Sequence, residues 1–173
     1  MKEEFTISIF TENKTGVLAR VLSVFTKRHI NIESITASQS SMEDIHRYTI
    51  VVILEETLVI KLVAQIEKQI DVLKSFYYDN TEILYQEIAL YKVPSKSMNN
   101  GMVVEKLIRK HSARIMDIED EYIVIEKTGL KEETEALLEE LRPHGIYEFV
   151  RSGRVAVVKP LEQLNNYLNT IKK

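Results

Sequence analysis

The chain has 173 residues, with 23 Lys and Arg against 26 Asp and Glu, which gives a net charge of −3, and it contains no Cys. The absence of Cys excludes disulfides, thiol nucleophiles, iron–sulfur clusters and Cys-ligated zinc. The longest apolar stretch, residues 48–54, is far shorter than the roughly 20 residues that span a bilayer. Mild acidity with scattered charges argues against a nucleic-acid binder. We therefore expect a cytoplasmic globular protein with one large or two small domains.

The first half of the chain predicts the order strand, helix, strand, strand, helix, strand. Apolar residues alternate over residues 5–10, and apolar residues at helical spacing follow Gly16, with Thr15 as the expected N-cap. The same reasoning predicts four further elements, which are a strand at 30–38, a strand at 45–54, a helix at 57–69 and a strand at 72–78. The polar run that begins at Asp79 favours a first domain over residues 1–78.

The second half, residues 79–173, repeats this order. We expect a strand at 83–93, a loop at 94–101, a helix at 103–111, strands at 114–120 and 122–127, a helix at 132–142, and a final strand or hairpin at 146–158. Leu161, Leu164, Leu168 and Ile171 predict a terminal amphipathic helix over residues 160–173, packed on its own domain or on a partner.

This repeat predicts an α+β protein made of two tandem ferredoxin-like βαββαβ domains. In such a unit both helices pack on one face of an antiparallel sheet. The other face then needs a partner or a second copy to cover it.

No pattern in the sequence points to catalysis. The four His residues do not have metal-ligand spacing, and no nucleophile elbow, P-loop or dinucleotide fingerprint occurs. We therefore expect no catalytic residue and no metal site. An acylphosphatase-like reaction through Arg20 and Asn13 is an alternative, but Arg20 is better explained as the exposed face of the first helix.

Two positions in the sequence, the turn at residues 13–16 and Asn31, favour a small-ligand site. Gly16 stands at the start of a helix, where unpaired N–H groups attract a carboxylate and a glycine permits close approach. Asn13 just before it offers an amide donor and an acceptor, and Asn31 at a strand entrance offers an oxygen to an ammonium group. Each of these residues also has a simpler explanation as part of a turn.

The residues around both positions resemble a known family. Residues 12–21 read Glu-Asn-Lys-Thr-Gly-Val-Leu-Ala-Arg-Val and residues 31–36 read Asn-Ile-Glu-Ser-Ile-Thr. This succession resembles an ACT domain and, more narrowly, the small regulatory subunit of acetolactate synthase (acetohydroxyacid synthase). Looser matches at 87–93, 113–118 and 150–156 extend the resemblance to about residues 3–159, whereas 39–45, 56–73 and 95–100 depart from it.

The resemblance implies a non-catalytic subunit. Such a subunit binds the catalytic large subunit of acetolactate synthase, raises its activity and confers feedback inhibition by valine or another branched-chain amino acid. Thiamine diphosphate, magnesium and FAD belong to the large subunit, so no cofactor is expected in this chain. The alternative is a stand-alone tandem-ACT amino-acid sensor that acts on a transcriptional or glycine-cleavage regulator.

The resemblance also implies a homodimer through the ACT domains, with the amino acid held between a strand-to-helix turn of one chain and a strand of the other. By motif position, the ligand-binding residues would be Asn13, Gly16, Val17 and Leu18 from one chain, and Asn31, Ile32, Ala37 and Ser38 from the other.

Overall fold

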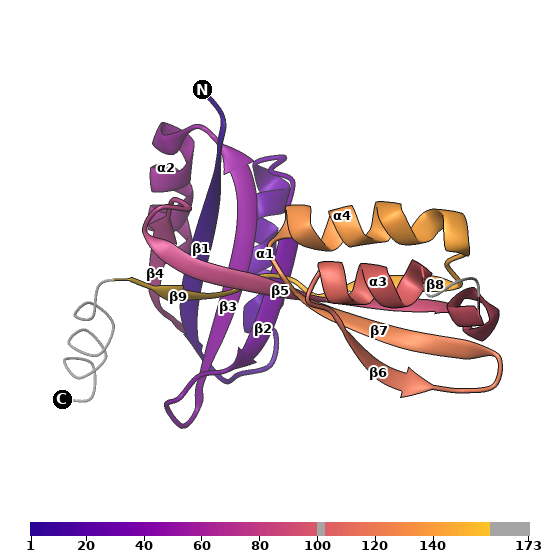
Figure 1. The fold of residues 1–173 in the computed structure, drawn as a ribbon. Coiled ribbons are helices and arrows are strands. Elements are labelled where there is room, and N and C mark those ends of the chain that lie inside the picture. The colour runs from indigo at the N-terminus through magenta and orange to yellow at the C-terminus, as the bar shows by residue number, and fades with distance from the viewer. Residues whose placement is uncertain (100–102, 160–173) are drawn as a thin grey trace. The chain divides into compact units, whose positions relative to one another are not determined.

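The structure is a computed structural model, and it describes residues 1–99 and 103–159. The chain forms two compact units. The first comprises residues 1–85 together with the segment that returns at Arg154, and the second comprises residues 86–153. The first half supplies β1 (Glu3–Glu12), α1 (Val17–Lys27), β2 (Ser34–Gln39), β3 (Ile45–Leu54), α2 (Glu56–Ile66) and β4 (Val72–Tyr78) (Figure 1).

The second half repeats these elements. In chain order it supplies β5 (Ile83–Pro94), a short 3-10 helix (Ser95–Asn99), α3 (Val103–Lys110), β6 (Arg114–Ile118), β7 (Tyr122–Gly129), α4 (Lys131–Leu141), a second 3-10 turn (Arg142–His144), β8 (Glu148–Arg151) and β9 (Val155–Val158). The predicted terminal helix at 160–173 lies outside the described residues. Among the described residues, no helix combines the length and apolar character that a membrane crossing requires.

The two sheets have the same strand order. They run β2-β3-β1-β4 and β6-β7-β5-β8, with antiparallel pairing of β1 to β3 and β4, and of β5 to β7 and β8. The predicted fold class, α+β with two tandem ferredoxin-like units, is confirmed. The functional division into residues 1–78 and 79–173 stays a prediction, since the contacts group residues 79–85 and the returning segment with the first unit.

The ends of α1 differ from the prediction. Gly16, not Thr15, is the residue before the helix, and it provides no side-chain cap. At the other end, the N–H groups of Arg28 and Ile30 bond back to the Phe25 carbonyl, and His29 has a φ of 54°. These bonds belong to a helix terminus, so β2 begins at Ser34 and not at Ile30.

The final segment is a strand, and the hairpin alternative is wrong. β8 and β9 both pair with β5, so they follow each other along one strand and do not pair together. Ser152 continues the pairing, because its N–H donates to the Ile88 carbonyl at 2.8 Å. The N–H of Lys159 donates to the Glu82 carbonyl at 3.0 Å.

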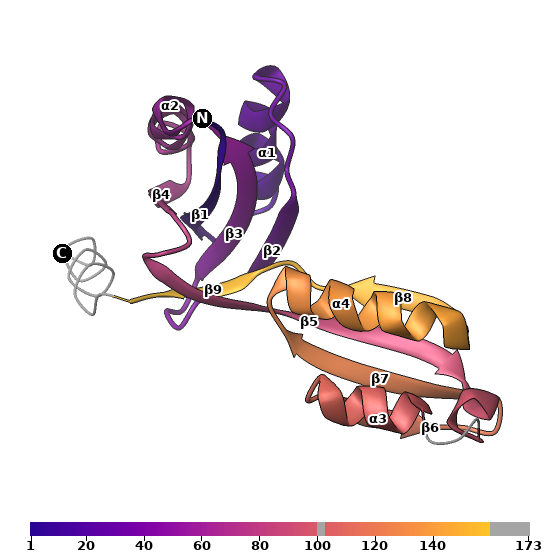
Figure 2. The ribbon, with the colours of Figure 1, turned by 45° about the horizontal axis from the view of Figure 1, so that its top comes forward.

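Each unit has a core between one face of its sheet and its two helices (Figure 2). In the first unit, Ile7, Ile9 and Ile50 from the central strands pack with residues of α1 and α2, as the period-two pattern predicts. In the second unit, the Tyr91 hydroxyl donates to the Thr134 carbonyl at 2.6 Å. Burial raises the pKa of Tyr91 to about 12, so this phenol stays protonated at neutral pH.

The chain covers part of the other face of the first sheet by itself. A second cluster joins Tyr78 to Ile83 at the start of β5 and to Ala156 in β9. Figure 2 shows β9 on the side of the sheet opposite α1 and α2. Thr6 and Ser8, which alternate with the core residues of β1, are buried under this cover. The expectation that only a partner or second copy would cover this face is therefore incomplete.

Candidate ligand-binding site

The turn between β1 and α1 is fixed by its backbone. Gly16 has a φ of +85°, a conformation that glycine adopts without strain. The N–H of Asn13 donates to the Asp44 carbonyl at 2.9 Å, and the N–H of Glu12 donates to the Asp71 carbonyl at 3.0 Å. Two neighbouring loops thus hold the turn in place.

The first turn of α1 presents N–H groups to the outside. The Val17 N–H donates to the Lys14 carbonyl at 3.4 Å, and the Arg20 N–H donates to the Gly16 carbonyl at 3.1 Å. The N–H groups of Leu18 and Ala19 have no acceptor within residues 1–99 and 103–159. Together with the helix dipole, these donors suit an anion such as an α-carboxylate.

A charged cluster stands beside the turn. The Asp71 carboxylate accepts from Arg20 Nη2 at 2.6 Å and pairs with Lys14 Nζ at 3.0 Å, and Lys14 also pairs with Glu12. The Glu12 carboxylate, followed by that of Asp71, raises the pKa of Lys14. Both cations are therefore neutralised by the protein's own carboxylates.

Sequence reasoning missed Asp71. It placed Arg20 on the exposed helix face, whereas the Arg20 side chain is only 40% exposed and reaches a residue 51 positions away. Asp71 has a φ of +68° in the turn before β4. The sequence carries no signal of this pairing, because neither residue belongs to a local motif with the other.

The predicted apolar contacts are mostly core residues. Val17 is fully buried, and Leu18 and Ile32 are half-buried and pack against the first core. Val17 would therefore meet a ligand through its backbone. Asn31 is exposed, and its Nδ2 donates to Glu33 Oε1 at 2.8 Å.

The eight predicted residues fall in three places within one chain. α1 has 11 residues and is about 16 Å long, and it separates the Gly16 turn from Asn31 and Ile32 at its other end. Ala37 and Ser38 lie exposed on the edge strand β2, opposite Tyr48 and Arg47 of β3. At about 3.3 Å per residue, they are roughly 15 Å or more from Asn31, farther than one valine reaches.

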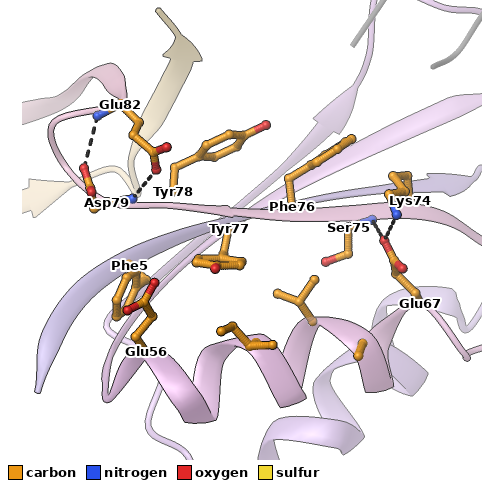
Figure 3. Close-up of a pocket in the computed structure, with 13 residues that line it drawn as sticks. Phe5, Glu56, Glu67, Lys74, Ser75, Phe76, Tyr77, Tyr78, Asp79 and Glu82 are labelled. Carbon is orange, nitrogen blue, oxygen red and sulfur yellow. Dashed lines mark hydrogen bonds and ion pairs between the residues drawn. The ribbon is translucent and has the colours of Figure 1, made fainter. Parts of the chain in front are cut away.

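A cavity of about 550 Å³ lies elsewhere, between α2 and β4. Figure 3 shows Tyr77 and Ser75 of β4 directed toward α2, with Phe5 beside them. Lys74 Nζ pairs with Glu67 Oε1 at 2.6 Å at one end of this cavity. None of the eight predicted residues lines it, so it is not the predicted site.

No group of three or more His, Cys, Asp or Glu side chains in the described part of the chain is arranged to hold a metal ion. The β1–α1 turn offers backbone donors at one end of α1, and Asn31 offers an amide at the other. These groups can bind a carboxylate and an ammonium group.

Comparison with known proteins identifies the family. The family profile described as AHAS small subunit-like ACT domain matches residues 7–74, and the profile described as Small subunit of acetolactate synthase matches residues 86–160. The acetolactate synthase small subunit of Bacillus subtilis is 38% identical over 172 residues, which cover 99% of this chain and 98% of that protein. This chain belongs to the acetolactate synthase small-subunit family.

Other members agree. The acetolactate synthase small subunit of Mycolicibacterium smegmatis is 37% identical over 152 residues, which cover 88% of this chain and 89% of the relative. The crystal structure of the small subunit from Thermotoga maritima superposes with a TM-score of 0.84 at 27% identity, covering 92% of this chain and 99% of that one. The resemblance inferred from residues 12–21 and 31–36 is confirmed, and the first unit is an ACT domain.

We predict that Asp71→Asn destabilises the β1–α1 turn, because it removes the carboxylate that holds Arg20. The Arg20–Asp71 bond is charge-assisted but partly exposed, so its loss should lower the free energy of unfolding by about 1 kcal/mol. Urea unfolding followed by circular dichroism measures this loss. Glu12→Gln is the matched control, since the Glu12–Lys14 pair is exposed and its loss should leave the midpoint near wild type. Equal midpoints for Asp71→Asn and wild type would contradict the role of Asp71.

Proposed function

We propose that this chain is the non-catalytic regulatory subunit of acetolactate synthase. It binds the catalytic large subunit, raises its activity and confers feedback inhibition by valine or a related branched-chain amino acid. The proposal places the protein in the cytoplasm, as a homodimer through its ACT domains. The reaction's thiamine diphosphate, magnesium and FAD are assigned to the large subunit, and no reacting group is assigned to this chain.

The observation that carries the effector site is the position of its two halves at opposite ends of α1. In a two-fold dimer, residue i of one chain meets residue j of the other and the reverse, so an axis perpendicular to α1 brings each end of this helix toward the opposite end of its copy. β2 is the edge strand of the first sheet and is largely exposed, which favours pairing of two copies along this edge. The Gly16 turn of one chain would then face Asn31 of the other.

The chemistry of these two ends suits a free amino acid. The α-carboxylate would bind the backbone N–H groups of Leu18 and Ala19 after Gly16, and the α-ammonium would donate to the Asn31 amide oxygen. Ala37 and Ser38 stay in the proposed set as contacts along the paired edges, at a distance from Asn31. Valine has 8 non-hydrogen atoms, and at about 1.5 kcal/mol per atom micromolar binding is within reach.

Inhibition requires more than binding. The amino acid lowers activity only if it binds a low-activity state of the assembly better than the active state. A site shared by two chains meets this requirement when the pairing of the two ACT domains differs between those states.

Affinity capture of the tagged chain from its own cells tests the partner. We expect it to retain an acetolactate synthase catalytic subunit, identified by mass spectrometry. Recovery of the chain alone, or with a transcriptional regulator, would favour the stand-alone sensor.

We predict that Gly16→Asp abolishes feedback inhibition of the reconstituted holoenzyme. The added carboxylate would stand where the carboxylate of the amino acid binds, and like charges repel. Inhibition curves with valine, leucine and isoleucine measure the effect. All three are titrated because one methylene changes apolar binding by only about 1–3 kcal/mol.

Gly16→Asn is the matched control for this charge. Asn and Asp have the same shape, and both tolerate a positive φ better than other side chains. We expect Gly16→Asn to retain measurable inhibition while Gly16→Asp loses it. A Gly16→Asp holoenzyme as sensitive as wild type would show that the site lies elsewhere.

We predict that Asn31→Ala weakens inhibition about tenfold or more, because it removes a hydrogen bond to the charged ammonium group. Activation of the large subunit should stay close to the wild-type value, and this serves as the internal control. Dose–response curves of the holoenzyme measure both quantities. Unchanged inhibition would remove Asn31 from the site.

A further inference from the structure

Arg154 is a buried cation on the open face of the first sheet. The residue is only 3% exposed, and both terminal nitrogens of its guanidinium bond to residues of the first unit. Nη2 pairs with Glu4 Oε1 at 2.6 Å, and Nη1 donates to Thr6 Oγ1 at 2.7 Å. Nη1 also donates to Asn80 Oδ1 at 3.1 Å, and the guanidinium lies 3.7 Å from the centroid of the Tyr85 ring.

These contacts fix one point of the returning segment. A guanidinium withdrawn from water is stable only when a carboxylate and further acceptors surround it, and Arg154 has such a shell. The shell draws on β1, on the turn after β4 and on the start of β5. The backbone of Arg154 is therefore held at one place over the sheet.

The backbone of Arg154 and of Ala156, two residues further along the chain, is bonded to β2 and β3. Thr36 Oγ1 in β2 donates to the Arg154 carbonyl at 3.1 Å. Arg47 Nη2 in β3 donates to the Ala156 carbonyl at 2.9 Å and to Ser8 Oγ at 3.0 Å.

Both of these donors adjoin predicted ligand-site residues. Thr36 immediately precedes Ala37 in β2, and Arg47 is the cross-strand partner of Ser38. β2 is also the strand that leads from Asn31 and lies at the edge where the proposed dimer forms. A shift of β2 against the sheet would therefore move the hydroxyl that bonds to Arg154.

The segment held in this way is joined directly to the end of the second unit. Gly153 is the last residue of that unit, and Arg154 begins the return to the first. The length of chain between the two units here is a single peptide bond. A displacement of the Arg154 backbone therefore also moves Gly153.

We propose that Thr36 and Arg154 form the coupling contact between the effector site and the second unit. The side chain of Arg154 holds the returning segment on the sheet. The Thr36 hydroxyl bonds to the Arg154 carbonyl, so a movement of β2 also moves that carbonyl. Both are positioning residues and do not touch the amino acid. This inference rests on the proposed function, because it requires that an amino acid bind at Asn31, just before β2.

Thr36→Val tests the contact. Valine keeps the branched shape that suits an edge strand but has no hydroxyl. In the wild-type homodimer, we expect saturating valine to slow hydrogen exchange of the amides of residues 153–158 about three- to tenfold, the range that one hydrogen bond supports. In Thr36→Val this slowing should disappear, and because coupling is reciprocal the Kd for valine measured by calorimetry should weaken by no more than the same three- to tenfold.

Thr36→Ser is the matched control, because it keeps the hydroxyl and should retain the slowing. In the reconstituted holoenzyme, Thr36→Val should keep activation but lose most of the valine inhibition, and Thr36→Ser should keep both. Leucine and isoleucine are run in parallel.

The outcomes separate the two proposals. If wild type binds and is inhibited by an amino acid, and Thr36→Val shows the same exchange slowing and the same inhibition, the coupling contact is wrong and the proposed function stands. If wild type binds none of the three amino acids, the proposed function fails and the coupling falls with it.

Arg154→Lys gives a second measurement on the same contact. Lysine keeps the charge but offers one nitrogen where two now contact Glu4 and Thr6. We expect faster exchange at residues 153–158 even without amino acid, and reduced inhibition at saturating valine. Wild-type exchange in this variant would contradict the anchoring role of Arg154.

Discussion

A four-stranded sheet that carries both helices on one face leaves its second face uncovered, and this constraint shapes the rest of the molecule. In the first unit the second face contains Thr6, Ser8 and Thr49, three polar side chains that are nevertheless buried. They are buried because the start of β5 and β9 lie over them, and two guanidinium groups bond to the Thr6 and Ser8 hydroxyls. The hydroxyls of Thr6 and Ser8 serve here as acceptors for Arg154, which is buried, and for Arg47, which is half-buried.

Patterns local in sequence predicted most of the fold. β3 spans the predicted residues 45–54 because its residues from Tyr48 to Leu54 are aromatic, β-branched or otherwise apolar and favour a strand. The start of β2 was not predictable in the same way, since His29 adopts a positive φ that no periodicity reveals. The Arg154 contacts with Glu4 and Thr6 join residues about 150 positions apart, and a single sequence carries no record of such pairing.

For the candidate site, the sequence predicted the turn but not its support. Gly16 was identified because a glycine before a helix has a distinct chemical meaning, and the structure gives it a φ of +85°. Asp71, which holds Lys14 and Arg20 beside that turn, lies on another loop and escaped detection. The turn and Asn31 lie at opposite ends of α1, so a site built from both exists only where two chains meet. Its apparent affinity would then depend on the concentration of the protomer as well as on that of the amino acid.

The first unit is assembled from two stretches of chain, with residues 86–153 inserted between them. During synthesis, the strands of its sheet are made before Arg154 and β9, so Thr6 and Ser8 are at first without their cover. Within the inserted unit, the Ser152 N–H donates to the Ile88 carbonyl and the Ile88 N–H donates to Ser152 Oγ, so the folded unit holds its two ends together. A folded second unit therefore replaces a long open loop by a closed one, which lowers the entropy cost of docking β9 on the first sheet. The first unit can be completed only after the whole second unit has been synthesised, although the first sheet is made earlier.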